Sequence, residues 1–283
     1  MPNAKIHTML FPGGKHKALT LSYDDGVLQD CRLIKQMAAY GIKGTFNLNS
    51  ALLGRAEQME VRGKTVDIST VRAEDVCTQY HGFEVATHGS KHSALTSYGS
   101  AALAEIIADR AALEKLTGYL VQGHAYPFGL YDKSVRRMLR TAGIRYARTV
   151  VSTHAFDLPK DFLKWHPTCH HADPDLMQLA EQFCTQNPLW GKPQLFFLWG
   201  HAYEFDADQN WEAIDAFFSY VSAYSDQIWM ATNGQIADYA EAFHSLRYFA
   251  NGSSVYNPSA HTVYLESCGT VYQIPSNATV VLD

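Results

Sequence analysis

Short apolar runs alternate with amphipathic segments along most of the chain. Residues 18–23 have strand composition, and residues 27–40 then carry apolar side chains at helical spacing up to Gly41, a typical C-cap residue. Residues 49–67 are polar and contain glycine, which predicts a long loop or a small hairpin. We expect further strands at residues 43–48, 83–87, 121–126, 145–149, 195–199 and 228–231, and further helices at residues 69–80, 100–117, 134–142, 174–186, 211–224 and 234–249.

This alternation predicts an α/β fold of parallel βα units, and the number of units favours a barrel over a small open sheet. Functional side chains are then expected at the C-terminal ends of strands. From residue 251 the pattern changes, because apolar positions alternate with turn formers at residues 257–259 and 275–277. We therefore expect a barrel over residues 1–250 and a small C-terminal β appendage over residues 251–283 that packs on it.

Composition narrows the class of protein. The chain has 283 residues, of which 47% are hydrophobic and 18% charged, so it can bury a substantial core. A net charge of -5 and the absence of a Lys/Arg stripe argue against nucleic acid as a partner. The five cysteines are odd in number, widely spread and without a Cys-x-x-Cys pair. This usage argues against a disulfide framework and a thiolate zinc site, and it fits a reducing compartment.

No segment has the character of a membrane anchor or leader. The N-terminal sequence lacks a long apolar stretch, and no run approaches the roughly 20 apolar residues of a membrane span. We expect no membrane partner. The expected location is cytoplasmic for the chain as written, or extracytoplasmic if a signal has been removed, and the oligomeric state stays open.

Two adjacent carboxylates end the first apolar run. Asp24 and Asp25 are expected at the C-terminal rim of a strand, and Gly26 allows a tight turn directly after them. Neighbouring side chains on an extended chain point to opposite faces, so the two acids are expected to hold different tasks. Asp-Gly is also ordinary turn chemistry, and a solvated turn is the alternative.

Histidines follow two later strands. His88 and His92 are four positions apart, so on one helical turn or a helix-like loop they face the same side. Two histidines and one carboxylate suffice for a catalytic zinc or similar ion with one position open for water, although such a pair can also be structural. The apolar strand at 195–199 is followed by His201, with Glu204 three residues further on. By itself, His201 can equally be a satisfied core or surface histidine.

A further motif, Tyr126-Pro127-Phe128-Gly129, stands at another strand end, between the His88–His92 pair and His201. In chain order, Asp-Asp-Gly, His-x-x-x-His, Tyr-Pro-Phe-Gly and the late strand ending in histidine resemble the motifs of the polysaccharide deacetylases of the NodB-homology group, carbohydrate esterase family 4, over roughly residues 17–240. The resemblance implies a distorted (β/α)7-type barrel. It also implies a metal-dependent hydrolase that removes N-acetyl groups from an N-acetylglucosamine-type saccharide by metal-activated water.

The resemblance also implies roles for single residues. The expected cofactor is one divalent metal ion, zinc first, with cobalt, nickel or another transition metal as alternatives. Asp24 would be the general base and His201 the general acid, while the backbone N–H of Phe128 would stabilise the oxyanion. The metal ligands would be Asp25, His88 and His92, and Tyr126 and Pro127 would belong to the substrate-binding motif.

The chain departs from the family pattern at two points. Ala125 stands where the third motif usually begins with the arginine that orients the base, and the fourth motif, a tryptophan and an acid, has no clear match. Residues 165–173 lie where a replacement could come from. One interpretation makes this stretch a loop lining the sugar site, with Trp165 as a stacking platform and His170 or His171 touching Asp24 or substrate. The alternatives are a structural segment or a separate Cys/His metal site, for which the spacing is poor. Glu204 could orient His201, bind substrate or lie at the surface.

Two other functions stay open at the level of sequence. The same scaffold could hydrolyse another amide, such as a cyclic imide or ureide, and the missing arginine favours this somewhat. A non-catalytic saccharide-binding module is the alternative from another class. Retention of both Asp24 and His201 argues against that module. A saccharide is therefore the expected partner.

Overall fold

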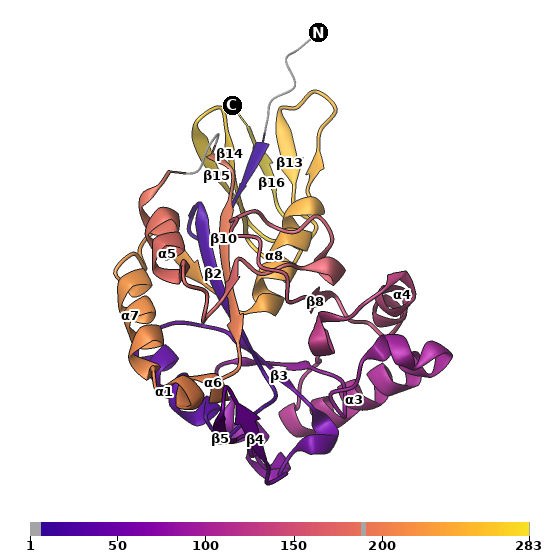
Figure 1. The fold of residues 1–283 in the computed structure, drawn as a ribbon. Coiled ribbons are helices and arrows are strands. Elements are labelled where there is room, and N and C mark those ends of the chain that lie inside the picture. Colours follow the sequence, from indigo (N-terminus) through magenta and orange to yellow (C-terminus); the bar gives the residue numbers. More distant parts are fainter. Residues whose placement is uncertain (1–6, 188–190, 283) are drawn as a thin grey trace.

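The computed structural model describes residues 7–187 and 191–282 (Figure 1). Residues 1–6, on which part of the expectation about a leader segment rests, lie outside the described residues, as do 188–190 and 283. Among the helices of the described part, none combines the length and apolar character needed to cross a membrane.

A curled parallel sheet forms the centre of the fold. Within the described residues it has eight strands in the order β8-β7-β6-β3-β2-β10-β9, and β11 pairs with the beginning of β2. A parallel bridge between Arg148 and Trp165 joins β8 to the segment leading into β9, so the two edges of the sheet meet. The strands are β2 (Lys17–Asp24), β3 (Thr45–Leu48), β6 (Glu84–Thr87), β7 (Gly123–Ala125), β8 (Tyr146–Arg148), β9 (Cys169–His170), β10 (Gln194–Gly200) and β11 (Ile228–Met230).

The long strands β2 and β10 lie side by side and hold the centre of this sheet. Their register runs from Gln194 opposite Lys17 to Gly200 opposite Tyr23. Every residue of β2 is buried, as expected for a parallel strand covered on both faces. The C-terminal ends of both strands therefore reach the same rim, which brings the residues that follow each strand close together.

Helices cover the outside of the sheet (Figure 1). The longer ones are α1 (Asp30–Ala39), α3 (Ala102–Thr117), α4 (Lys133–Thr141), α5 (Leu176–Thr185), α7 (Trp211–Ser222) and α8 (Asn233–His244), and the short ones are α2 (Val76–Gln79) and α6 (Tyr203–Asp208). α8 begins at a capping box in which Thr232 and Gln235 exchange hydrogen bonds. α5 and α7 pack on β10 through a cluster of buried aromatic side chains that includes Phe183, Phe196 and Phe217.

Short antiparallel sheets complete the fold. β4 (Gln58–Val61) and β5 (Lys64–Asp67) form a hairpin within the stretch predicted as a loop or hairpin. The C-terminal strands are β13 (Ser254–Tyr256), β14 (Val263–Ser267), β15 (Thr270–Ile274) and β16 (Thr279–Val281), and they pack against the end of α8. Two strands from before residue 251 join them, because β1 (His7–Leu10) pairs with β14 and β12 (Arg247–Tyr248) pairs with β13.

The predicted α/β barrel and its order of strands and helices are confirmed, with three differences. The last helix ends at His244, because the chain turns there and enters β12. The predicted helix at 69–80 is a 3-10 turn followed by a four-residue α2. The strands β1 and β9 and the short helix α6 are missing from the prediction, and β9 and α6 lie at the rim where polar residues interrupt the apolar periodicity.

Candidate active site

The two acids after β2 lie at the rim in different backbone conformations. Asp24 is the last residue of the strand, whereas Asp25 has a φ of 77° and donates its N–H to the Asn47 carbonyl over 3.0 Å. Gly26 also has a positive φ, and a Cβ there would meet the side chain of Leu48 at 2.7 Å. The chain therefore turns sharply after Asp24. The expectation that the two carboxylates point to opposite faces is wrong, because Asp25 is not extended and both face the same imidazole.

That imidazole belongs to His88, which follows β6 in a tight turn and not in a helical one. Gly89 and His92 both have positive φ angles, of 73° and 50°. The Asn49 amide donates to the carbonyls of His88 and Gly89 over 2.8 and 2.7 Å, which holds the turn in place. The two imidazoles still come together, with ring centroids 4.8 Å apart.

Hydrogen bonding decides which nitrogen of His88 is free. Its Nδ1 lies 2.8 Å from the carbonyl oxygen of Ala125, which can only accept, so Nδ1 carries the proton. In the neutral ring, Nε2 therefore keeps a lone pair. It lies 3.7 Å from Asp25 Oδ1, and His92 Nε2 lies 3.8 Å from the same oxygen. These separations are too long for hydrogen bonds, and the three ligand atoms lie within 4.8 Å of one another.

Asp25, His88 and His92 thus have the chemistry of a divalent-cation site. One carboxylate and two imidazoles match the donor set of catalytic zinc sites, and the backbone acceptor on His88 Nδ1 is the outer support that such ligands have. Asp24 Oδ2 lies 3.6 Å from His88 Nε2 but points toward other partners.

Those partners hold Asp24 as an ionised carboxylate. The side chain is 2% exposed; Asn47 donates to Oδ1 over 2.8 Å, and Arg148 donates to Oδ2. Burial alone would raise the pKa of Asp24, but Arg148, His88, His201 and the Asn47 hydrogen bond together lower it to about 2. A buried arginine on β8 therefore orients this acid in place of the one missing at position 125.

His201 approaches the same carboxylate from the end of β10. Its Nε2 lies 3.9 Å from Asp24 Oδ2, and its Nδ1 lies 3.4 Å from Glu204 Oε2 on α6. Burial lowers the pKa of His201, but the close Glu204 carboxylate and the charges of Asp24 and Asp25 raise it to about 9. His201 is thus held as an imidazolium beside Asp24. Of the three roles left open for Glu204, the geometry matches contact with His201.

The residues of the 165–173 stretch lie elsewhere than predicted. Trp165 is 1% exposed and packs among Tyr146, Phe162 and Phe197, so the prediction of a stacking platform for sugar is wrong. This tryptophan fills the core where the segment bridges to β8. His170 and His171 do not contact Asp24; both turn toward Glu204.

In the Tyr126-Pro127-Phe128 motif, the first two residues are buried and the third is exposed. Tyr126 is fully buried, its hydroxyl donates to the Leu163 carbonyl over 2.8 Å, and Pro127 is buried as well, so neither side chain faces a ligand as predicted. Phe128 has a φ of 57° and is 60% exposed. The centroid of its ring lies 4.6 Å from that of His92, so the Phe128 side chain packs against a candidate metal ligand.

A core role for Trp165 gives a testable result. Trp165→Ala is expected to lower the free energy of unfolding by about 3–5 kcal/mol, because it leaves a large cavity. Phe128→Ala, which removes an exposed ring, should change it by no more than about 0.5 kcal/mol. Urea denaturation of both variants measures the difference. If Trp165→Ala is as stable as the wild type but binds saccharide more weakly, Trp165 stacks on the sugar and does not serve the core.

Two residues of the site are missing from the sequence prediction. Arg148 is fully buried, and its Nε also donates to Ser22 Oγ over 3.1 Å while its guanidinium stacks on Trp199. Asn47 is fully buried in β3. The available signal was a charged or amide side chain inside a strand that the pattern marks as buried, since such groups are rarely buried without a partner.

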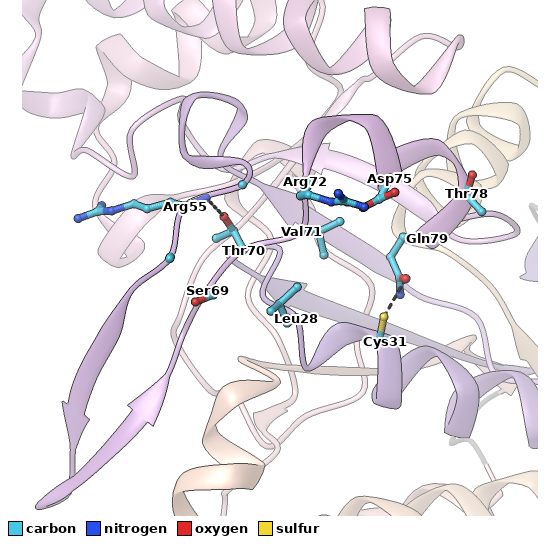
Figure 2. Close-up of a pocket in the computed structure, with 12 residues that line it drawn as sticks. Leu28, Cys31, Arg55, Ser69, Thr70, Val71, Arg72, Asp75, Thr78 and Gln79 are labelled. Carbon is cyan, nitrogen blue, oxygen red and sulfur yellow. Dashed lines mark hydrogen bonds and ion pairs between the residues drawn. The ribbon is translucent and has the colours of Figure 1, made fainter.

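A cavity of about 530 Å³ lies apart from this constellation (Figure 2). Leu28, Cys31 and Gln79 line one side of it, and Arg55 and Thr70 line another. The Cys31 thiol donates to Gln79 over 2.8 Å. None of the acids or histidines described above lines this cavity.

Comparison with known proteins agrees with the geometry. A family model described as polysaccharide deacetylase matches residues 12–147, which include Asp24, Asp25, His88 and His92. No curated protein matches the chain significantly. A candidate polysaccharide deacetylase from Mycobacterium smegmatis, of known crystal structure, is 19% identical with a TM-score of 0.58, over 86% of this chain and 96% of that one. At this identity the likeness shows a common fold.

Two further solved structures are more distant. The family 4 carbohydrate esterase from Streptomyces lividans, solved with acetate, is 14% identical with a TM-score of 0.48, over 77% of this chain and 93% of that one. The peptidoglycan deacetylase PdaC from Bacillus subtilis is 16% identical with a TM-score of 0.47, over 81% of this chain and 95% of that one.

Proposed function

Since the chain belongs to the polysaccharide deacetylase family, we propose that it is a metal-dependent hydrolase that removes N-acetyl groups from an N-acetylglucosamine-type saccharide. One observation carries this proposal. Asp25, His88 and His92 point free ligand atoms at one another, and a second carboxylate, Asp24, lies beside them with an arginine and an amide as its own partners. The site thus holds a cation-binding group and a separate base.

The cation is proposed to be zinc, which suits a site of two imidazoles and one carboxylate. When bound, a divalent ion would supply Lewis-acid chemistry, polarising a carbonyl and lowering the pKa of water. Asp24 then removes the proton of the attacking water, since it is ionised at neutral pH and its orientation is held by Asn47 and Arg148.

His201 supplies the proton that the departing amine needs. It is held as an imidazolium 3.9 Å from the base, and an amine is a poor leaving group unless it is protonated. The backbone N–H of Phe128, beside His92, is proposed to donate to the oxyanion. Acetate and a free amino sugar are the products.

One argument for the alternative substrate, a cyclic imide or ureide, no longer applies. The missing arginine favoured it at the level of sequence, but in this chain another arginine, Arg148, pairs with Asp24. The substrate assay below includes small cyclic amides so that the outcome decides between them.

The proposal is tested by acetate release from N-acetylglucosamine oligomers. We expect purified protein to release acetate, to lose this activity after treatment with a chelator, and to regain it with one equivalent of Zn²⁺. Cyclic imides and ureides are assayed in parallel. If the protein hydrolyses only the cyclic imides or ureides, these are its substrates and the N-acetylated saccharide is not. Saccharide binding without release of acetate in the zinc-loaded protein would instead identify a binding module.

A further inference from the structure

A cluster of imidazoles, none of them among the candidate metal ligands described above, surrounds Glu204. His170 and His171 follow one another at the end of β9, and their Nε2 atoms lie 3.1 and 3.2 Å from Glu204 Oε2. Gly200 makes room for this arrangement, because a Cβ there would lie 2.0 Å from His171 Nδ1. The His-His pair of the 165–173 stretch is thus built around a single carboxylate.

This cluster has the composition of a metal site, but its hydrogen bonds indicate another role. The backbone N–H of Ala172 donates to His170 Nδ1 over 3.1 Å, so in the neutral ring the proton lies on Nε2, which faces Glu204. A protonated Nε2 is a donor and not a ligand. Burial, the largest influence, keeps the pKa of His171 down at about 4. The short distances to Glu204 are therefore those of imidazole N–H groups donating to a carboxylate.

The same carboxylate oxygen reaches the proton donor. Glu204 Oε2 accepts the backbone N–H of His201 over 3.3 Å and lies 3.4 Å from His201 Nδ1. With Nδ1 turned to Glu204, Nε2 is turned to Asp24 and the reacting centre. The orientation of the His201 ring is therefore decided by where Glu204 is held.

We propose that Glu204 is a positioning residue for His201, and that His170 and His171 hold Glu204 in place for this task. The role in catalysis rests on the proposed function, in which His201 protonates the leaving amine. Glu204 performs this task from the first turn of α6, three residues after His201.

The charges around both groups agree with this arrangement. Burial would raise the pKa of Glu204, but the close imidazoles of His170, His171 and His201 lower it far below its usual range, so the group stays ionised. Arg62 at the tip of the β4–β5 hairpin faces its other oxygen over 4.0 Å. His201 is faced by Glu204 from α6, by Asp24 and Asp25 from the end of β2, and by the ring of Tyr203.

Glu204→Gln tests the proposal, with Asp208→Asn as the matched control. Asp208 is on the same helix and pairs with Arg62, but it has no contact with His201. The first readout is the ¹⁵N spectrum of the His201 ring in metal-free protein, assigned with a His201→Gln sample. We expect Glu204→Gln to lower the pKa of His201 and to shift its ring-nitrogen signals, and Asp208→Asn to leave both as in the wild type.

The second readout compares leaving groups. An acetamide needs a proton on its amine, whereas an aryl acetate ester releases a phenolate that needs none. Glu204→Gln is expected to lower kcat on the acetamide about 10- to 100-fold, part of the 10²–10⁴ that a general acid contributes, and to leave ester hydrolysis nearly unchanged. His170→Ala changes a partly exposed side chain and serves as a second variant in case Glu204→Gln folds poorly. It should lower kcat on the acetamide by a smaller factor and likewise leave ester hydrolysis nearly unchanged.

Unchanged His201 signals in a folded Glu204→Gln or His170→Ala protein would overturn the proposal. So would two zinc ions per wild-type chain falling to one in Glu204→Gln, since that result makes the cluster a second metal site. A wild-type protein that hydrolyses neither substrate contradicts the proposed function instead, and the ring-nitrogen signals then still decide whether Glu204 positions His201.

Discussion

Asp24→Asn is expected to lower kcat by about 10²- to 10⁴-fold while the zinc content of the protein stays at one ion per chain. Asparagine keeps the shape of the side chain and can still accept the Asn47 hydrogen bond, but it cannot take a proton from water. The loss should therefore fall on kcat with little change in KM. Acetate release gives the kinetic constants, and elemental analysis of the dialysed protein gives the metal content.

The matched variant is Asp25→Asn, one residue further along the chain. Asp25 Oδ1 is the oxygen that faces both His88 and His92, so its replacement should weaken metal binding, and added zinc should restore part of the activity. Circular dichroism checks that both variants are folded. If Asp24→Asn turns over at the wild-type rate, Asp24 is not the base; if it loses its metal, Asp24 is a ligand.

Much of the fold follows from the chain's periodicity. Strands such as β2 and β10 are buried along almost their whole length because both faces of the sheet are covered, and residues at their ends reach one rim whatever the loops between them do. For this reason Asp24, His88 and His201 could be grouped from sequence. What could not be derived is the local turn, since Asp25, in the left-handed region, bonds to Asn47 in β3, and His92, also left-handed, bonds to Gly89 in the turn after β6.

Partners that come from distant strands were the harder part of the site. Arg148 lies 124 residues after Asp24, and nothing in the spacing of the β8 segment marks it as the partner of that acid. Trp165 shows the opposite error. A tryptophan in a polar, histidine-rich stretch suggests a residue that stacks on sugar. In the structure, however, the backbone of Trp165 pairs with Arg148 and its side chain is buried in the core. Composition alone cannot separate these two cases.

Arg148→Met is expected to destabilise the protein by about 3–5 kcal/mol and to reduce activity at neutral pH. The arginine is fully buried with the 2% exposed Asp24, so its removal leaves a buried carboxylate without its cation. Arg145→Met is the matched control three residues earlier. Arg145 pairs with Asp238 and Glu241 near the surface, where ion pairs contribute up to about 1 kcal/mol. Urea denaturation of both variants separates the two expectations.

The pH dependence of the same variant tests why activity falls. In the wild type the pKa of Asp24 is lowered from 3.8 to about 2, so this group contributes about 2 kcal/mol of stability above pH 4 that is lost as the pH falls toward 2. Without Arg148, burial should raise the pKa of Asp24, and the acid limb of kcat/KM should move to higher pH with it. Arg145→Met should keep the wild-type limb. An unmoved limb in folded Arg148→Met would show that the guanidinium orients Asp24 without setting its charge.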